Sequence, residues 1–244
     1  MEPVALVTGS ARRIGATIVR TLHAAGMRVI IHYRGSQQEA EALALELNQS
    51  RPGSARLLQA DLDNPDAVRK LATQALEAFG QLDLLVNNAS SFYPTPIESA
   101  SDDDWTRLIH SNLRAPYILS QSLATALRQQ QGSIINIVDV YAEKPLFQHT
   151  LYCMAKAGLA MMTKSLAREL GPEVRVNGVS PGPILWPESG QMNQDAITDA
   201  TALKRCGSPE DIANAVKWLA RDAGFVTGQI LAVDGGRSLT LQGS

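Results

Sequence analysis

Cysteine is scarce in this chain, neither charge predominates, and long apolar runs are missing. Two cysteines, Cys153 and Cys206, are too few for a disulfide framework and have no metal-ligand spacing to the four histidines, so we expect no metal site. The 22 Lys and Arg residues stand against 24 Asp and Glu residues and are scattered along the chain, which argues against a nucleic-acid partner.

No segment approaches the roughly 18 consecutive apolar residues that suggest a membrane span, and the first residues do not have the pattern of a secretory signal. We therefore expect a cytoplasmic protein that makes no contact with a membrane. With 244 residues, 45% of them hydrophobic, the chain can bury the core of one domain, and we expect residues 1–244 to form it.

Short apolar runs alternate along the chain with segments of helical period. The runs are VALVT, RVIIHY, ARLLQAD, LDLLVNNA, SIINIVD, VRVNGVS and QILAVD, and the helical segments are 15–25, 37–49, 65–79, 101–129, 151–170 and 208–220. The runs are apolar throughout, as strands are when helices cover both faces of a parallel sheet. The sequence therefore predicts an α/β fold, a Rossmann-type doubly wound sheet of about seven parallel strands with helices on both faces.

Residues 181–200 form the longest segment without a clear period, and they are rich in Pro, Gly, Asn and Asp. We interpret this segment as a substrate lid, with a disordered insertion as the alternative. The sequence suggests no role for Trp186 and Glu188 within it.

A glycine-bounded turn, TGSARRIG at 8–15, follows the first apolar run. Gly9, Gly15 and a helix beginning near Arg13 would place backbone N–H groups and a helix N-terminus against the pyrophosphate of a dinucleotide. Such a turn between a strand and a helix is often only a turn, so neighbouring segments must decide between the two interpretations.

The second run leads into HYRGS, residues 32–36, and no acidic residue stands at its end. A carboxylate there would bond the ribose 2′-hydroxyl of NAD, whereas a 2′-phosphate attracts a guanidinium. Arg34 and Ser36, with Arg12 across the turn, therefore predict NADP(H) as the cofactor. The alternative for Arg34 is an ordinary surface arginine.

Two further strand ends carry polar side chains. Asp61–Leu62 ends the third run, where a carboxylate can accept from the adenine amino group, and Asn87–Asn88–Ala89 ends the fourth. Ligands of open α/β sheets gather at such ends. Either group could instead cap a loop.

Tyr152 and Lys156 stand four residues apart, on one face of a predicted helix. An ammonium group stabilises a nearby phenolate, so we expect Lys156 to lower the pKa of Tyr152 and to make proton donation to a reduced carbonyl or imine feasible. Plain helix packing also places Tyr and Lys at this spacing.

The motifs, taken in order, resemble those of the short-chain dehydrogenase/reductase family over essentially the whole chain. They are TGSARRIG, Asp61, NNA at 87–89, Asn112, the strand before Asp139, YCMAK at 152–156 and the SPGP turn at 180–183. The resemblance implies that Tyr152 donates the proton, that Lys156 binds the nicotinamide ribose, and that Asn112 holds a water that relays protons to Lys156. It also implies that Pro181, Gly182 and Ile184 border the nicotinamide.

The family resemblance further implies a homotetramer, with the helices near 101–129 and 151–170 pairing between subunits. From the motifs and the resemblance together we expect the following residues to bind the cofactor: Gly9, Arg12, Arg13, Ile14, Gly15, Tyr33, Arg34, Ser36, Asp61, Leu62, Asn88, Ala89, Lys156, Pro181, Gly182 and Ile184.

Two positions depart from the family pattern. Arg13 replaces a usual glycine of the loop, and Asp139 replaces the usual catalytic serine, 13 residues before Tyr152. An ionised Asp139 would repel the alkoxide-like oxygen of a ketone under reduction. It suits a substrate with a protonated ring nitrogen, or it must be a neutral carboxylic acid of raised pKa that shares a proton with Tyr152.

These departures, with NNASSFYPTP at 87–96 and HYRGS, are similar to the pteridine reductase branch of the family, which includes bacterial dihydromonapterin reductases. In that branch the loop arginine reaches both cofactor phosphate and pterin, and an aromatic residue stacks the pterin against the nicotinamide. These roles fall on Arg13 and Phe92, with Ser90 offering a hydrogen bond and with Asp139 and Tyr152 serving proton transfer.

The resemblance therefore implies an NADPH-dependent pteridine reductase that transfers hydride to a C=N bond of an oxidised pterin or dihydropterin. A general carbonyl or quinone reductase of the same family is the alternative, because a protonated Asp139 would mimic serine. A further alternative is an NADPH-binding regulator that has lost turnover.

Overall fold

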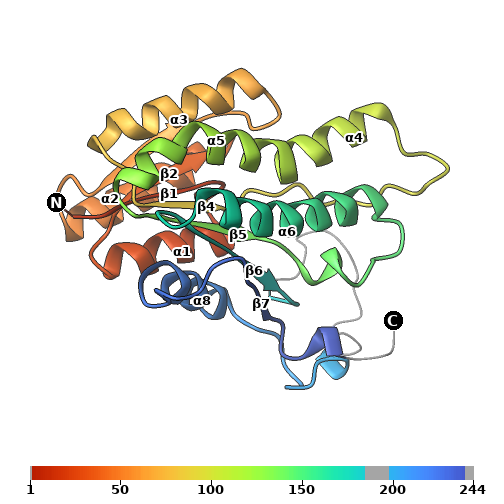
Figure 1. Ribbon diagram of the computed structural model, residues 1–244. Coiled ribbons are helices and arrows are strands. Elements are labelled where there is room, and N and C mark those ends of the chain that lie inside the picture. The colour runs from red at the N-terminus through yellow and green to blue at the C-terminus, as the bar shows by residue number, and fades with distance from the viewer. Residues whose placement is uncertain (1, 185–197, 240–244) are drawn as a thin grey trace.

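The computed structural model describes residues 2–184 and 198–239. Seven parallel strands form one sheet in the order β3-β2-β1-β4-β5-β6-β7, and helices cover both of its faces (Figure 1). The strands are β1 (Val4–Val7), β2 (Arg28–Tyr33), β3 (Ala55–Gln59), β4 (Leu84–Asn87), β5 (Ser133–Ile137), β6 (Arg175–Pro181) and β7 (Ile230–Val233). This arrangement confirms the predicted doubly wound sheet.

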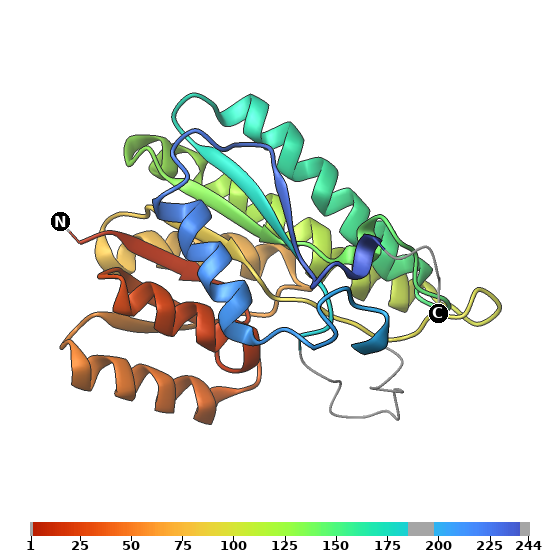
Figure 2. The same cartoon turned by 90° about the horizontal axis from the view of Figure 1, so that it is seen from below.

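Helices α1, α2 and α8 cover one face of the sheet, and α3, α5 and α6 cover the other (Figures 1 and 2). The long helices are α1 (Arg13–Ala24), α2 (Gln37–Ser50), α3 (Pro65–Phe79), α4 (Asp102–Ile109), α5 (Ala115–Gln129), α6 (Thr150–Leu170) and α8 (Pro209–Arg221). In β1, Ala5 and Val7 pack toward the first group and Val4 and Leu6 toward the second. Burial on both faces explains why the strands are apolar throughout.

Local signals fix where three of these helices begin. The Asn64 side chain accepts hydrogen bonds from the N–H groups of Asp66 and Ala67 at the start of α3. Ser101 and Ser208 each form a capping box with the aspartate three residues later, at the starts of α4 and α8. These side chains satisfy backbone donors that have no partner within the helix.

The segment predicted as one helix over 101–129 is not uniform. A π-helical turn, His110–Arg114, separates α4 from α5, which begins at Ala115 just before Pro116. A π turn adds one residue to the turn without breaking the helix, and such turns are frequent at functional sites. The prediction missed it because hydrophobic spacing over a long segment does not register one extra residue.

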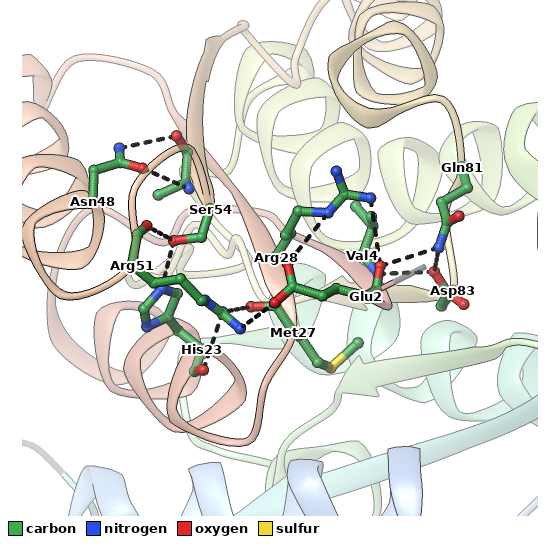
Figure 3. Close-up of polar contacts among 11 residues, drawn as sticks. Glu2, Val4, His23, Met27, Arg28, Asn48, Arg51, Ser54, Gln81 and Asp83 are labelled. Atoms are coloured by element: carbon green, nitrogen blue, oxygen red, sulfur yellow. Dashed lines mark hydrogen bonds and ion pairs between the residues drawn. The ribbon is translucent and has the colours of Figure 1, made fainter.

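A polar cluster ties together the amino-terminal edge of the sheet (Figure 3). Arg51 forms an ion pair with Glu2 at 3.1 Å and donates to the carbonyl oxygen of Met27, which precedes β2. The Asp83 carboxylate accepts the Val4 N–H at 2.8 Å and so joins β4 to β1. The opposite, carboxyl-terminal edge carries the polar motifs identified in the sequence.

Candidate active site

The glycine-bounded turn is held against the end of β4. The Thr8 hydroxyl oxygen accepts the N–H groups of Asn88 at 2.9 Å and Ala89 at 3.0 Å. The Asn88 side-chain amide donates to the carbonyl oxygens of Thr8 and Gly9, at 2.8 and 3.0 Å. A Cβ on Gly15 would lie 2.5 Å from the Gly9 carbonyl oxygen, so only glycine lets α1 begin this close to the turn.

Arg13, the first residue of α1, has a φ of 56°. A positive φ strains a side chain with a Cβ by roughly 1–2 kcal/mol, which gives a physical reason for the glycine that the family has at this position. The chain instead places a fixed positive charge at the N-terminus of the helix. Arg13 and Arg12 both border the pocket described next.

A pocket of about 470 Å³ lies between the glycine-bounded turn and the ends of β2, β3 and β4. Three arginines and the N-terminus of α1 border it, which is a donor set that fits the phosphates of a dinucleotide. The pocket brings together many of the residues predicted to bind the cofactor or substrate: Gly9, Arg12, Arg13, Ile14, Gly15, Tyr33, Arg34, Ser36, Leu62, Asn88, Ala89 and Ser90.

Arg34 lines the pocket just after β2, and two acids hold it. Its Nη1 is 3.3 Å from Asp63 Oδ2 and 3.8 Å from Asp61 Oδ1. Asp63, which the sequence interpretation missed, lines the pocket beside Leu62, whereas the exposed Asp61 accepts the Asp63 N–H at 3.1 Å. The presence of a second acid, two residues after Asp61, could have pointed to a partner for Arg34.

Tyr152 and Asp139 are joined by a direct hydrogen bond. The Tyr152 hydroxyl donates to Asp139 Oδ2 at 2.7 Å, and the Tyr141 N–H donates to Asp139 Oδ1 at 2.9 Å. Lys156 Nζ donates to the Ile137 carbonyl oxygen at 2.9 Å and lies 5.6 Å from the centroid of the Tyr152 ring. Helix α6 thus supplies the phenol and the amine, and the chain after β5 supplies the carboxyl group.

Burial governs the protonation of this group of residues. Tyr152 is 4% exposed and Lys156 is 2% exposed. Burial raises the pKa of Asp139, and burial together with the charge of Asp139 raises the pKa of Tyr152 well above its usual value. Burial also lowers the pKa of Lys156 to about 8. The expected lowering of the Tyr152 pKa by Lys156 is not found in this structure: the pKa is raised, and burial and the charge of Asp139 are the largest causes.

Asn112 lies in the π-helical turn, and both hydrogens of its side-chain amide have partners. Its amide donates to the carbonyl oxygens of Ser91 at 3.0 Å and Leu108 at 2.9 Å. Its oxygen accepts the Ser90 hydroxyl at 2.6 Å. The π turn therefore fixes the Ser90–Ser91 segment beside Tyr152.

Phe92 forms an aromatic wall of the site. Its ring meets the Tyr152 ring edge-on at 4.8 Å between centroids, and it stacks on the His149 ring at 4.7 Å with 19° between the planes. The Phe92 side chain is 44% exposed, so it is not a core residue. No motif or spacing in the sequence pointed to His149, which directly precedes α6.

The end of β6 lies beside the segment that leads from β5 to Asp139, because the Val138 N–H donates to the Val179 carbonyl oxygen at 2.7 Å. Gly182 approaches the backbone of Asp234, where a Cβ would lie 2.6 Å from the Asp234 Cα. Ile184 lines a second pocket, of about 420 Å³, with Asp234. Most of the predicted lid, including Trp186 and Glu188, falls at 185–197, outside the described residues.

Within residues 2–184 and 198–239 there is no group of three or more His, Cys, Asp or Glu side chains that could hold a metal ion. Over the same ranges, none of the helices has the length and apolar character needed to cross a membrane.

Comparisons with known proteins agree with this geometry. A family model described as enoyl-(acyl carrier protein) reductase matches residues 9–238. The chain belongs to the short-chain dehydrogenase/reductase family of NAD(P)-dependent oxidoreductases.

The relatives are spread over several activities. Pteridine reductase 1 of Leishmania tarentolae is 38% identical, over 98% of this chain and 97% of the relative. The 3-oxoacyl-[acyl-carrier-protein] reductase of Synechocystis sp. is 36% identical, over 96% of each chain. The crystal structure of a blue fluorescent protein from a metagenomic library, in complex with NADPH, is 38% identical, with a TM-score of 0.91 over 96% of this chain and 97% of the other.

Proposed function

We propose that this protein is an NADPH-dependent pteridine reductase. The observation that carries the proposal is the 2.7 Å hydrogen bond from Tyr152 to Asp139, at the position where the family usually has serine, with the Phe92 ring edge-on to the same tyrosine. Similarity to the Leishmania tarentolae pteridine reductase supports it.

NADP(H) is the coenzyme in this proposal, and it supplies the hydride when bound. Arg34 and Ser36 hold the 2′-phosphate, and the N-terminus of α1 with Arg12 and Arg13 holds the pyrophosphate. The similar protein solved in complex with NADPH supports this assignment. Lys156 Nζ, a donor buried beside Tyr152, binds the nicotinamide ribose.

Asp139 and Tyr152 handle the proton in the proposed reaction. Because burial raises the pKa of Asp139, this carboxyl group holds a proton at a higher pH than an exposed aspartate does. Once Asp139 is protonated, it is a neutral acid and no longer the carboxylate that holds the Tyr152 hydroxyl. It can then pass its proton to a ring nitrogen, directly or through Tyr152. The ionised form pairs with a protonated ring nitrogen.

The Phe92 ring suits a flat heterocycle. Offset stacking on an aromatic side chain contributes on the order of 1 kcal/mol beyond burial. Ser90, held by Asn112 at 2.6 Å, offers a hydroxyl to the polar edge of the ring, and Arg13 offers a charge where substrate and pyrophosphate meet. Asn112 also holds the water of the proposed proton relay to Lys156.

A general carbonyl reductase is the second candidate. The raised pKa of Asp139 favours it too, because a neutral carboxylic acid donates a hydrogen bond to a developing alkoxide as serine does. The similarity to the Synechocystis 3-oxoacyl reductase also favours it.

Steady-state rates separate the two candidates. We expect kcat/KM with dihydrobiopterin or dihydrofolate to exceed kcat/KM with quinones, simple ketones and an acetoacetyl thioester. Replacing Asp139→Ser should lower the pterin rate and raise the ketone rate. Faster turnover of ketones than of pterins by the unaltered enzyme would overturn the first candidate.

We propose a cytoplasmic homotetramer as the assembly. Large apolar side chains stand exposed on the helices expected to pair between subunits, namely Trp105 on α4, Tyr117 on α5, and Met154 and Met161 on α6. Burial of such side chains drives association. Sedimentation equilibrium measures the mass directly, and a monomer at micromolar concentration would contradict the proposal.

A further inference from the structure

His32 is a buried polar side chain within the apolar strand β2. It is 2% exposed, and both ring nitrogens have partners on neighbouring segments. Nδ1 lies 3.0 Å from the Gly9 backbone nitrogen, in the glycine-bounded turn. Nε2 lies 3.2 Å from the Ala60 carbonyl oxygen, just after β3. One imidazole therefore links the ends of β1, β2 and β3.

The two partners of His32 determine its tautomer. The Gly9 N–H can only donate, so Nδ1 must present its lone pair, and the Ala60 carbonyl can only accept, so Nε2 must carry the hydrogen. The ring is therefore neutral when both hydrogen bonds exist. In agreement with this geometry, burial lowers the pKa of His32 to about 4.

The backbone of the glycine-bounded turn is satisfied from inside the protein at two successive donors. The Gly9 N–H goes to the His32 ring, and the Ser10 N–H goes to the His32 carbonyl oxygen at 2.9 Å. The Asn88 side-chain amide donates to the Gly9 carbonyl oxygen at 3.0 Å. These bonds hold the turn against β2 and β4 and so set where α1 begins, at Arg13, on the border of the pocket. A helix N-terminus is a favourable site for an anion.

We infer that His32 is a positioning residue for the coenzyme: by accepting the Gly9 N–H, it holds the glycine-bounded turn in the form that presents the N-terminus of α1 to the pyrophosphate. The inference rests on the proposed coenzyme role of this pocket. The Gly9 bond acts on the turn that faces the pyrophosphate, which NADPH and NADH share, so the inference predicts that its loss weakens both coenzymes by the same factor.

Three substitutions separate the two hydrogen bonds. His32→Phe keeps a planar ring and removes both bonds. His32→Asn places an amide oxygen near the position of Nδ1 and keeps the acceptor for Gly9. His32→Gln carries its amide nearer to the position of Nε2 and keeps the donor to Ala60 without the acceptor for Gly9.

The measurement is the dissociation constant of NADPH and of NADH for the full chain, from the change in nicotinamide fluorescence without any substrate. Leaving the Gly9 N–H unpaired should weaken both coenzymes about tenfold in His32→Phe and in His32→Gln. His32→Asn should stay within about threefold of the unaltered protein. The ratio of the two dissociation constants should not change in any variant. Amide hydrogen exchange at Gly9 should quicken in His32→Phe and His32→Gln and not in His32→Asn.

Several outcomes would overturn the inference. Unaltered NADPH binding by folded His32→Phe is one, and a changed ratio of NADPH to NADH affinity is another. If His32→Phe does not fold, the Asn and Gln variants still test the inference. Equal NADPH affinity of these two variants would overturn it, because only His32→Asn keeps an acceptor for the Gly9 N–H. Failure of the unaltered protein to bind NADPH would instead refute the proposed coenzyme, and reduction of ketones in place of pterins would leave the role of His32 intact.

Discussion

The Tyr152 hydroxyl donates its hydrogen bond to the Asp139 carboxylate, at 2.7 Å. The phenol proton is therefore directed at the side chain that replaces the family's serine. Tyr152 can donate toward a substrate only when Asp139 is protonated or turns to another partner. Proton transfer in this protein thus depends on the pair and not on the tyrosine alone.

Replacing Tyr152→Phe should abolish reduction and spare coenzyme binding. General acid catalysis contributes about 10²–10⁴-fold, so we expect a loss of that size in kcat, with the NADPH dissociation constant unchanged. Tyr117→Phe, which removes the same hydroxyl from α5 and keeps the ring at the proposed subunit interface, is the matched control and should keep full activity. Stopped-flow measurement of NADPH oxidation checks this, and undiminished turnover by Tyr152→Phe would remove the tyrosine from the mechanism.

Replacing Asp139→Asn should stabilise the protein above the usual pKa of an aspartate. Because burial raises the folded-state pKa of Asp139 from 3.8, the stability linked to its proton is present below pH 3.8 and is lost as pH rises through the folded pKa. The amide has no such loss. We expect a higher Tm for the variant than for the unaltered protein at pH 8 and no difference near pH 3.8.

Thermal melts of Asp139→Asn across this pH range provide the measurement. Asp222→Asn, at an exposed site after α8, makes the same chemical change away from Tyr152 and is the control for the substitution itself. A variant less stable than the unaltered protein at pH 8 would show that the carboxylate is stabilised in place.

Replacing Arg34→Asp should shift coenzyme preference from NADPH toward NADH by more than about tenfold. A third carboxylate beside Asp61 and Asp63 repels a 2′-phosphate and can accept from a 2′-hydroxyl. The ratio of kcat/KM with the two coenzymes measures the shift. Arg69→Asp, on the exposed side of α3, is the charge-matched control, and an unchanged ratio in Arg34→Asp would refute the assignment of the 2′-phosphate.

Two substitutions at Arg13 separate backbone strain from charge. At a φ of 56°, Arg13→Gly relieves strain that Arg13→Ala keeps, so the glycine variant should be the more stable by about 1 kcal/mol. Both remove the charge beside the pocket and should weaken NADPH binding about tenfold. Thermal melts and coenzyme titrations of the pair check this. Equal stability would mean that the positive φ costs nothing, and unchanged binding would mean that the charge does not reach the coenzyme.

The sequence alone determined the sheet, because its strand segments are apolar on both faces. A parallel sheet between two layers of helices buries both faces of such strands. It also located the glycine-bounded turn, Arg34, Asp139 and Tyr152, since each belongs to a motif of fixed spacing. Only the tertiary structure showed that Tyr152 donates to Asp139 and that burial raises the pKa of both groups, because desolvation depends on what surrounds a group in space. His32, Asp63 and His149 emerged only there as well, for their partners lie on other strands and loops and leave no period or spacing in the chain.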